Sequence, residues 1–218
     1  MIFLALLQPT ARAIGWRSGL ITALAGAFIA AVPVLFSVEL QPDDLATILR
    51  MVAATGALSI GFLLHDGAST ISSVVPTSRL TRNLARVFWI GVAAIPWWIV
   101  ILLLVGFGAG ADQREALPLT GLTAEALAIL GVALAAAAGA QRLGAEEHVG
   151  LIVAMAVIVL TFGAVLLPGD MAVVLPPSDP RFADARIWWL LMALFSVLAF
   201  LALSREWASS KTVARRRA

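Results

Sequence analysis

Six apolar segments, each long enough to cross a bilayer, constrain most strongly what this chain can fold into. They cover residues 16–37, 45–64, 84–107, 123–140, 150–167 and 187–203. About 20 helical residues span the roughly 30 Å of hydrocarbon in a bilayer. Backbone amides in lipid need hydrogen-bond partners, and the segments lack the alternation of barrel strands, so we predict helices. The predicted fold class is all-α, a polytopic membrane bundle of about six transmembrane helices.

The composition excludes a water-soluble domain. Of the 218 residues, 61% are hydrophobic and only 13% are charged, and the mean hydropathy is +0.98. Such a chain has too few polar residues to cover a surface in water. It contains no cysteine, which excludes disulfides, thiolate catalysis and cysteine metal sites. We therefore predict one transmembrane domain that covers residues 1–218.

The basic residues predict the orientation. One set of loops and ends carries Arg12, Arg17, Arg79, Arg82, Arg86, Arg142, Arg205, Lys211, Arg215, Arg216 and Arg217, whereas the opposite set carries Arg50, Arg114, Arg181 and Arg186. Because the more basic loops stay in the cytoplasm, we expect both termini there and the protein in the cell inner (plasma) membrane. The basic rim predicts anionic lipids as partners, and no nucleic acid.

The two ends of the chain have different predicted roles. Residues 1–15 have an apolar stripe followed by Arg12 and Arg17, which predicts an interfacial helix with Trp16 at headgroup level. The alternative is a ragged start of the first span. Pro9 interrupts the apolar run, so a cleavable signal peptide does not fit. Residues 204–218 are predicted to form a basic cytoplasmic tail.

The connection at residues 65–83 shows a pattern of its own. Asp66 and Gly67 can end the second span and start a new element. Apolar residues then recur at helical spacing, at Ile71, Val74 and Val75, and Pro76 ends the run. The pattern predicts a short amphipathic helix at the membrane surface. After it, Arg79, Arg82 and Arg86 share a helical face, where they can reach phosphates or an acidic partner. The alternative is a solvated turn with positive-inside arginines.

The chain resembles the six-span permease subunits of type-two ABC exporters, a class that exports drugs, antibiotics and polysaccharides. The resemblance covers nearly the whole chain and rests on residues 6–20 (LLQPTARAIGWRSGL), 62–87 (FLLHDGASTISSVVPTSRLTRNLARV) and 166–180 (LLPGDMAVVLPPSDP). It implies that residues 66–76 form a coupling helix that docks into an ATPase. It also implies an outer re-entrant or loop segment at residues 168–186.

This resemblance implies further partners. Such permeases work as homo- or heterodimers with two ABC ATPase subunits, which bind ATP and Mg²⁺. The chain itself has one lysine, Lys211, with no glycine-rich loop before it. We therefore expect ATP hydrolysis in a partner, no cofactor in this chain and no enzymatic activity of its own.

Other functions stay open as alternatives. Ser69 with His65 and His148 is a weak match to an intramembrane serine protease, and Glu146-Glu147-His148 is a weak match to a membrane metalloprotease. All of these residues fall in predicted loops. A structural or assembly subunit of another membrane complex and a secondary carrier are the remaining alternatives. A carrier is disfavoured because few ionisable groups lie within the spans.

Three residues within the spans are candidates for a transport pathway. Arg50 lies about two turns into the second span and is expected to reach Asp43, Asp44 or Glu125, either as a structural anchor or at the outer end of a pathway. Trp97 and Trp98 follow Pro96 in mid-span, where a kink is expected. They line a hydrophobic route or only pack.

The apolar spans predict an amphipathic or lipophilic substrate. Small residues four apart also recur in the first and fourth spans, at Gly15, Gly19 and Ala23 and at Gly131, Ala135 and Gly139. Such stripes allow backbones to approach closely, either between two chains or within one.

Overall fold

The structure is a computed structural model that describes residues 7, 8, 10–12, 14–36, 40–64, 78–168 and 171–205. Within these ranges the chain forms helices and no strand. The helices are α2 (Trp16–Leu35), α3 (Pro42–Leu63), α5 (Arg79–Gly108), α6 (Ala111–Ala116), α7 (Leu119–Arg142), the short 3₁₀ helix η1 (Glu146–His148), α8 (Val149–Val165) and α9 (Phe182–Ser204).

Six of these segments, α2, α3, α5, α7, η1 with α8, and α9, are long and apolar enough to cross a membrane. The predicted all-α membrane bundle is confirmed, and the chain is a multi-pass membrane protein. The third span is longer than predicted, because α5 begins at Arg79 rather than near residue 84. The hydroxyl of Ser78 accepts a hydrogen bond from the Thr81 amide at 3.2 Å and so caps this early start.

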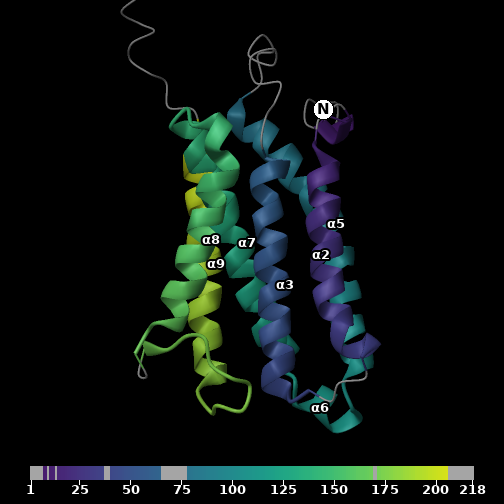
Figure 1. The fold of residues 1–218 in the computed structure, drawn as a ribbon. Helices are drawn as coiled ribbons and strands as arrows, with labels where there is room; N and C mark the ends of the chain where they lie inside the picture. Colours follow the sequence, from purple (N-terminus) through teal and green to yellow (C-terminus); the bar gives the residue numbers. More distant parts are fainter. Residues whose placement is uncertain are drawn as a thin grey trace, which may run out of the picture.

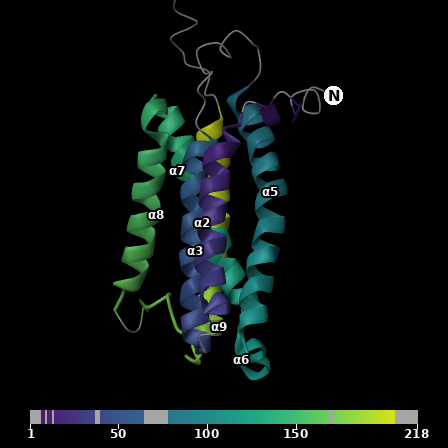
Figure 2. The same ribbon diagram turned by 45° about the vertical axis from the view of Figure 1, so that its right-hand side comes forward.

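The second span, α3, lies in the middle of the bundle and contacts α2, α5, α7 and α8. Figures 1 and 2 show α2 and α5 to one side of it and α8 towards the opposite flank. The most extensive packing joins α7 to α9. α3 and α7 are therefore the most enclosed spans, and α2, α5, α8 and α9 present most of the apolar surface to lipid.

Glycines allow the closest helix contacts. A Cβ on Gly131 would lie 3.0 Å from Ser196 of α9, and a Cβ on Gly19 would lie 2.9 Å from Leu63 of α3. A Cβ on Gly61 of α3 would meet the backbone of Gly150 in α8 at 2.9 Å. Gly19 and Gly131, one from each small-residue stripe, are thus used for packing within the chain.

The two ends of the bundle differ in charge. The basic end, where α2 begins and α9 ends (Figure 1), carries Arg12, Arg17, Arg79, Arg82, Arg86, Arg142 and Arg205. The acidic end, where α3 begins, carries Asp43, Asp44, Asp112, Glu115, Asp179 and Asp184 and includes the short helix α6, which the sequence did not predict. The membrane side of each end stays a prediction.

The N-terminal segment is helical at residues 7–8 and 10–12. The indole N–H of Trp89 in α5 donates to the Leu7 carbonyl at 2.9 Å, and that of Trp16 donates to the Ala11 carbonyl at 2.7 Å. Two tryptophans therefore tie this segment to the basic end of the bundle.

Candidate functional site

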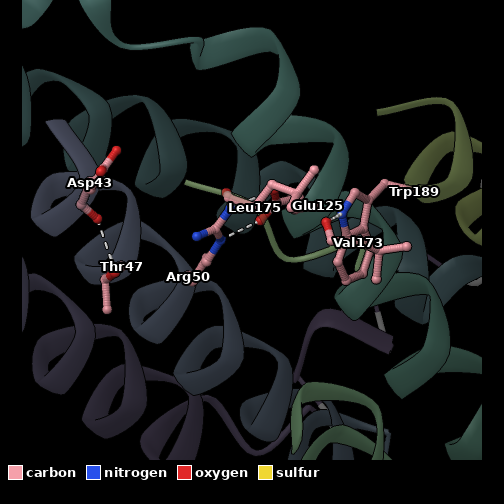
Figure 3. A network of polar contacts seen from close by, with 7 residues as sticks. All are labelled: Asp43, Thr47, Arg50, Glu125, Val173, Leu175 and Trp189. Carbon is pink, nitrogen blue, oxygen red and sulfur yellow. Dashed lines mark hydrogen bonds and ion pairs between the residues drawn. The ribbon is translucent and has the colours of Figure 1, made fainter. Parts of the chain in front are cut away.

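A charged pair joins α3 to α7 within the apolar part of the bundle. Arg50 Nε donates to Glu125 Oε2 at 2.6 Å and Arg50 Nη2 donates to Glu125 Oε1 at 3.0 Å. This fork-like geometry is typical of strong arginine–carboxylate pairs. The Glu125 side chain is 4% exposed and that of Arg50 is 16% exposed. Of the three acids expected to meet Arg50, the structure pairs it with Glu125 (Figure 3).

The same arginine holds the segment between α8 and α9. Arg50 Nη2 also donates to the Leu175 carbonyl at 2.7 Å, and the Leu175 side chain is buried. The indole of Trp189 in α9 donates to the Val173 carbonyl at 2.9 Å (Figure 3). Residues 172–181 contain turns and no helix. Where the resemblance implied a re-entrant or loop segment, these residues therefore form a loop fixed to α3 and α9.

A third contact completes this attachment at the acidic end. The hydroxyl of Ser178 donates to Asp43 Oδ2 at 2.9 Å. Asp43 thus binds the loop, whereas Arg50 pairs with Glu125. Further along the loop, Asp179 accepts hydrogen bonds from Arg181, whose guanidinium lies 3.1 Å away. This side-chain hydrogen bond holds the pKa of Asp179 below its usual value.

A cluster of hydrogen-bonded polar groups joins four helices at the basic end. Its centre is the Leu64 carbonyl at the end of α3, which accepts from Arg86 Nη1 at 3.0 Å and from Gln141 Nε2 at 2.8 Å. Asn83 Nδ2 lies 3.1 Å from Gln141 Oε1 and 3.1 Å from Ser204 Oγ. We call Leu64, Asn83, Arg86, Gln141 and Ser204 the Leu64 junction. It connects α3, α5, α7 and α9.

The Leu64 junction lies next to the loop that was predicted to couple to an ATPase. Leu64 immediately precedes residues 65–77, and Ser78, which caps α5, follows them. The predicted coupling residues Asp66, Gly67, Ile71, Val74 and Val75 lie outside the described residues, as do His65 and Ser69. Leu64 is therefore fixed to α5 and α7, and Ser78 caps the first turn of α5.

Three arginines were expected to share one helical face at the start of the third span, where they can reach phosphates or an acidic partner. Arg79 is exposed and donates to the Gln141 carbonyl at 3.4 Å, and Arg82 is half-buried. Arg86 is 8% exposed and turns inward to Leu64, so the expectation that it reaches phosphates or a partner was wrong. The reason is physical: the carbonyls that end α3 need donors inside an apolar bundle.

An apolar cavity of about 430 Å³ lies between α2, α3, α5 and α7. Trp97 and Trp98 both line it, whereas Arg50 does not. The Trp97 indole lies in a notch between two glycines, because a Cβ on Gly26 of α2 or Gly56 of α3 would lie 2.8 Å or 3.1 Å from the ring. Trp97 of α5 thus packs against α2 and α3 and also forms part of a cavity wall.

The tryptophan N–H groups both have partners. Trp97 Nε1 donates to the Ala23 carbonyl at 3.1 Å, and Trp98 Nε1 donates to the Thr123 hydroxyl at 3.4 Å. The lining offers almost no polar surface. The cavity therefore suits a hydrocarbon rather than a polar ligand.

Sequence reasoning missed the residues of the Leu64 junction on α7 and α9. Gln141 and Ser204 end long apolar spans, and Asn83 lies near the start of another. An isolated amide or hydroxyl near the end of a span could have indicated a contact with another helix, because polar side chains often hydrogen-bond across helices in membranes.

The described residues contain no group of three or more histidine, aspartate or glutamate side chains that could hold a metal ion. Glu146 and His148 lie in η1, in the turn between α7 and α8. We found no protein-family model, curated protein or solved structure that matches this chain.

Proposed function

We propose that this chain is the membrane-spanning subunit of an ATP-driven ABC exporter, which moves an amphipathic or lipophilic substrate while a separate ATPase subunit hydrolyses ATP. The observation that carries the proposal is the Leu64 junction. It links the helix end that leads into residues 65–77 to three other spans. In an exporter, this loop would be the contact with the ATPase.

The Leu64 junction gives the loop a mechanical connection to the bundle. A displacement of residues 65–77 would act on Leu64, and from there through Arg86 on α5 and through Gln141 on α7. Exposed Arg79 and half-buried Arg82 lie at the other end of the loop and would contribute to docking. Packed helices with two discrete arrangements could then alternate between inward and outward access.

The cavity supports the substrate class. Its apolar lining includes Trp97 and Trp98 and suits an apolar molecule. Arg50 is engaged with Glu125 and Leu175, which favours the role of structural anchor over that of pathway residue. Neither Arg50 nor Glu125 lines the cavity. Their ion pair therefore gives no support to a secondary carrier, which would need ionisable groups along its transport pathway.

The complete exporter would contain two permease chains and two ABC ATPases, with ATP and Mg²⁺ bound by the ATPases. It would lie in the cell inner membrane with the basic end and both termini in the cytoplasm. A structural or assembly subunit of another membrane complex is the alternative.

The test is to extract the tagged chain from its native membrane in mild detergent and to identify its partners by intact-complex mass spectrometry. We expect two permease chains with two ATP-binding subunits. Recovery of a lone chain, or of a complex without an ATPase, would overturn the proposal.

A matched pair of loop variants makes this test specific. Ile71→Glu places a charge on the predicted apolar face of the loop, and Ser73→Glu places the same charge opposite that face. We expect Ile71→Glu to remove the ATPase from the complex and Ser73→Glu to retain it. Equal recovery of the ATPase with both variants would argue against docking through this face.

A further inference from the structure

The cavity between α2, α3, α5 and α7 opens towards the lipid. Four of its lining residues are at least half exposed on the outer surface of the bundle: Leu20 (60%), Ile95 (65%), Ile99 (50%) and Leu127 (53%). All four are apolar and lie in membrane-spanning helices. The molecules that meet this opening in a membrane are therefore acyl chains.

The cavity begins at the basic end of the bundle. Its lining on α3 runs from Ala53 to Leu63, which is about 15 Å along a helix. This is about half of the 30 Å hydrocarbon thickness. On α2 the lining begins at Trp16, the first residue of that helix at the basic end. On α5 and α7 the lining residues 90–99 and 123–130 lie further towards the acidic end, so an acyl chain that enters at the basic end can extend beyond the middle of the bundle.

The polar atoms of the lining are already satisfied within the chain. Ser59 Oγ donates to the Gly56 carbonyl at 2.6 Å, and Thr123 Oγ1 donates to the Leu119 carbonyl at 2.7 Å. The indole N–H groups of Trp16, Trp97 and Trp98 have the partners given above. An occupant consequently needs no polar group at this depth.

A positive charge lies beside the end of the cavity. Arg17 is exposed and precedes the lining residue Leu20 by three positions, so both lie on the same side of α2. Arg12, also exposed, lies just before α2. A phosphate at headgroup level would meet arginine side chains that can bind it.

We propose that the cavity binds one acyl chain of an anionic phospholipid, whose phosphate lies at Arg17. The volume of about 430 Å³ is large enough for a small ligand. This site belongs to the single chain and requires neither an ATPase nor transport, so it goes beyond the proposed function and is tested independently of it.

The test uses the purified full chain in neutral phosphatidylcholine vesicles that contain a small amount of phosphatidylglycerol with a photoactivatable group on its acyl chain. After illumination, labelled peptides are quantified by mass spectrometry. We expect labels to concentrate on residues 90–99 of α5 and 123–130 of α7. Labelling spread evenly over the lipid-facing sides of α8 and α9 would overturn the proposal.

Two variants fill the cavity and one controls for the added bulk. Ala94→Phe and Ala93→Phe enlarge lining residues, whereas Ala25→Phe adds the same group to an exposed position of α2 that does not line the cavity. Each methylene excluded from the site should weaken binding about fourfold, so we expect a loss of cavity labelling of about tenfold or more. Ala93, which is exposed, provides a second variant if Ala94→Phe does not fold.

The headgroup is tested separately with Arg17→Gln. We expect this variant to lower labelling by photoactivatable phosphatidylglycerol more than labelling by photoactivatable phosphatidylcholine, because the choline group offsets the charge of the phosphate that both lipids carry. If both lipids label the cavity equally in the parent chain, the assignment of Arg17 to the phosphate is wrong. If Ala94→Phe and Ala93→Phe both fold and label like Ala25→Phe, the acyl-chain site is wrong.

Discussion

The two ends of the bundle are fastened by different chemistry. At the acidic end, a charged pair between Arg50 and Glu125 fixes α3, α7 and the carbonyl of Leu175. At the basic end, the amides of Asn83 and Gln141 and the hydroxyl of Ser204 share hydrogen bonds around Leu64, with Arg86 as the one charged member.

This difference teaches which end of the molecule can rearrange. A buried ion pair has one good arrangement, because either partner alone would leave an uncompensated charge in a medium of low dielectric constant. At the basic end, Arg86 donates to the Leu64 carbonyl. The other hydrogen bonds there join neutral groups; such bonds between membrane helices are each worth about 0.6 kcal/mol and can find other partners. We therefore expect a rigid acidic end and an adjustable basic end.

The largest effect is expected when the ion pair is broken. Glu125→Leu leaves the Arg50 guanidinium without its counter-charge, and removing one partner of a buried pair costs about 3–5 kcal/mol. The free energy of unfolding in mixed detergent micelles should fall by this amount. A variant as stable as the parent would show that the pair does not fasten the acidic end.

The control for this prediction removes both charges. Arg50→Leu combined with Glu125→Leu leaves no unpaired charge, so we expect it to be more stable than Glu125→Leu alone. It should remain below the parent, because the Leu175 carbonyl also loses its donor. If the double variant loses the sum of the two single losses, the two charges are not coupled.

A smaller effect is expected at the basic end. Gln141→Leu removes the donor to the Leu64 carbonyl and the acceptor for Asn83, and we expect a loss of about 1–2 kcal/mol by the same measurement. Combined with Asn83→Ala, the losses should be less than additive, since both variants remove one shared hydrogen bond. A loss as large as that of Glu125→Leu would erase the proposed contrast between the two ends.

The smallest effect is expected for the surface pair on the acidic-end loop. The hydrogen bond from Arg181 lowers the pKa of Asp179 from its usual value of 3.8. A lowered folded-state pKa stabilises the protein above the unfolded value, and this contribution is lost as the pH falls through the folded value. The small stability difference between the parent and Asp179→Asn should therefore be present at neutral pH and disappear below the folded pKa.

This pH dependence is measured by thermal unfolding in detergent at several pH values. An unchanged difference at low pH would mean that Asp179 contributes through its shape and not through its charge. The Arg181 side chain is about half exposed, and pairs at the surface contribute little. The comparison with Arg50 and Glu125 thus isolates the effect of burial.

The fold was predictable because lipid leaves few choices. Long apolar runs must become helices, so the positions of all six spans could be predicted. The same reasoning limited the partner of Arg50 to three acids, one of which is Glu125. The choice of Glu125 over Asp43 depended on the path of the loop, because Ser178 takes the carboxylate of Asp43. Spacing within α3 alone does not contain that information.

The Leu64 junction was less predictable for a related reason. Gln141, Asn83 and Ser204 are far apart in sequence, and each looks like an ordinary polar residue near the end of a span. The expectation for Arg86 failed because positive-inside arginines are usually solvated, whereas here one supplies a donor to a helix end. The short helix α6 was missed because six residues carry too little periodicity to reveal a helix.

The ion pair also has a consequence for how the protein is made. Arg50 and Glu125 are 75 positions apart, so at 5–20 residues per second the ribosome needs about 4–15 s to supply the partner. During that time the guanidinium of Arg50 in the second span has no Glu125 with which to pair. A chain that ends before α7 would keep that charge without its carboxylate partner.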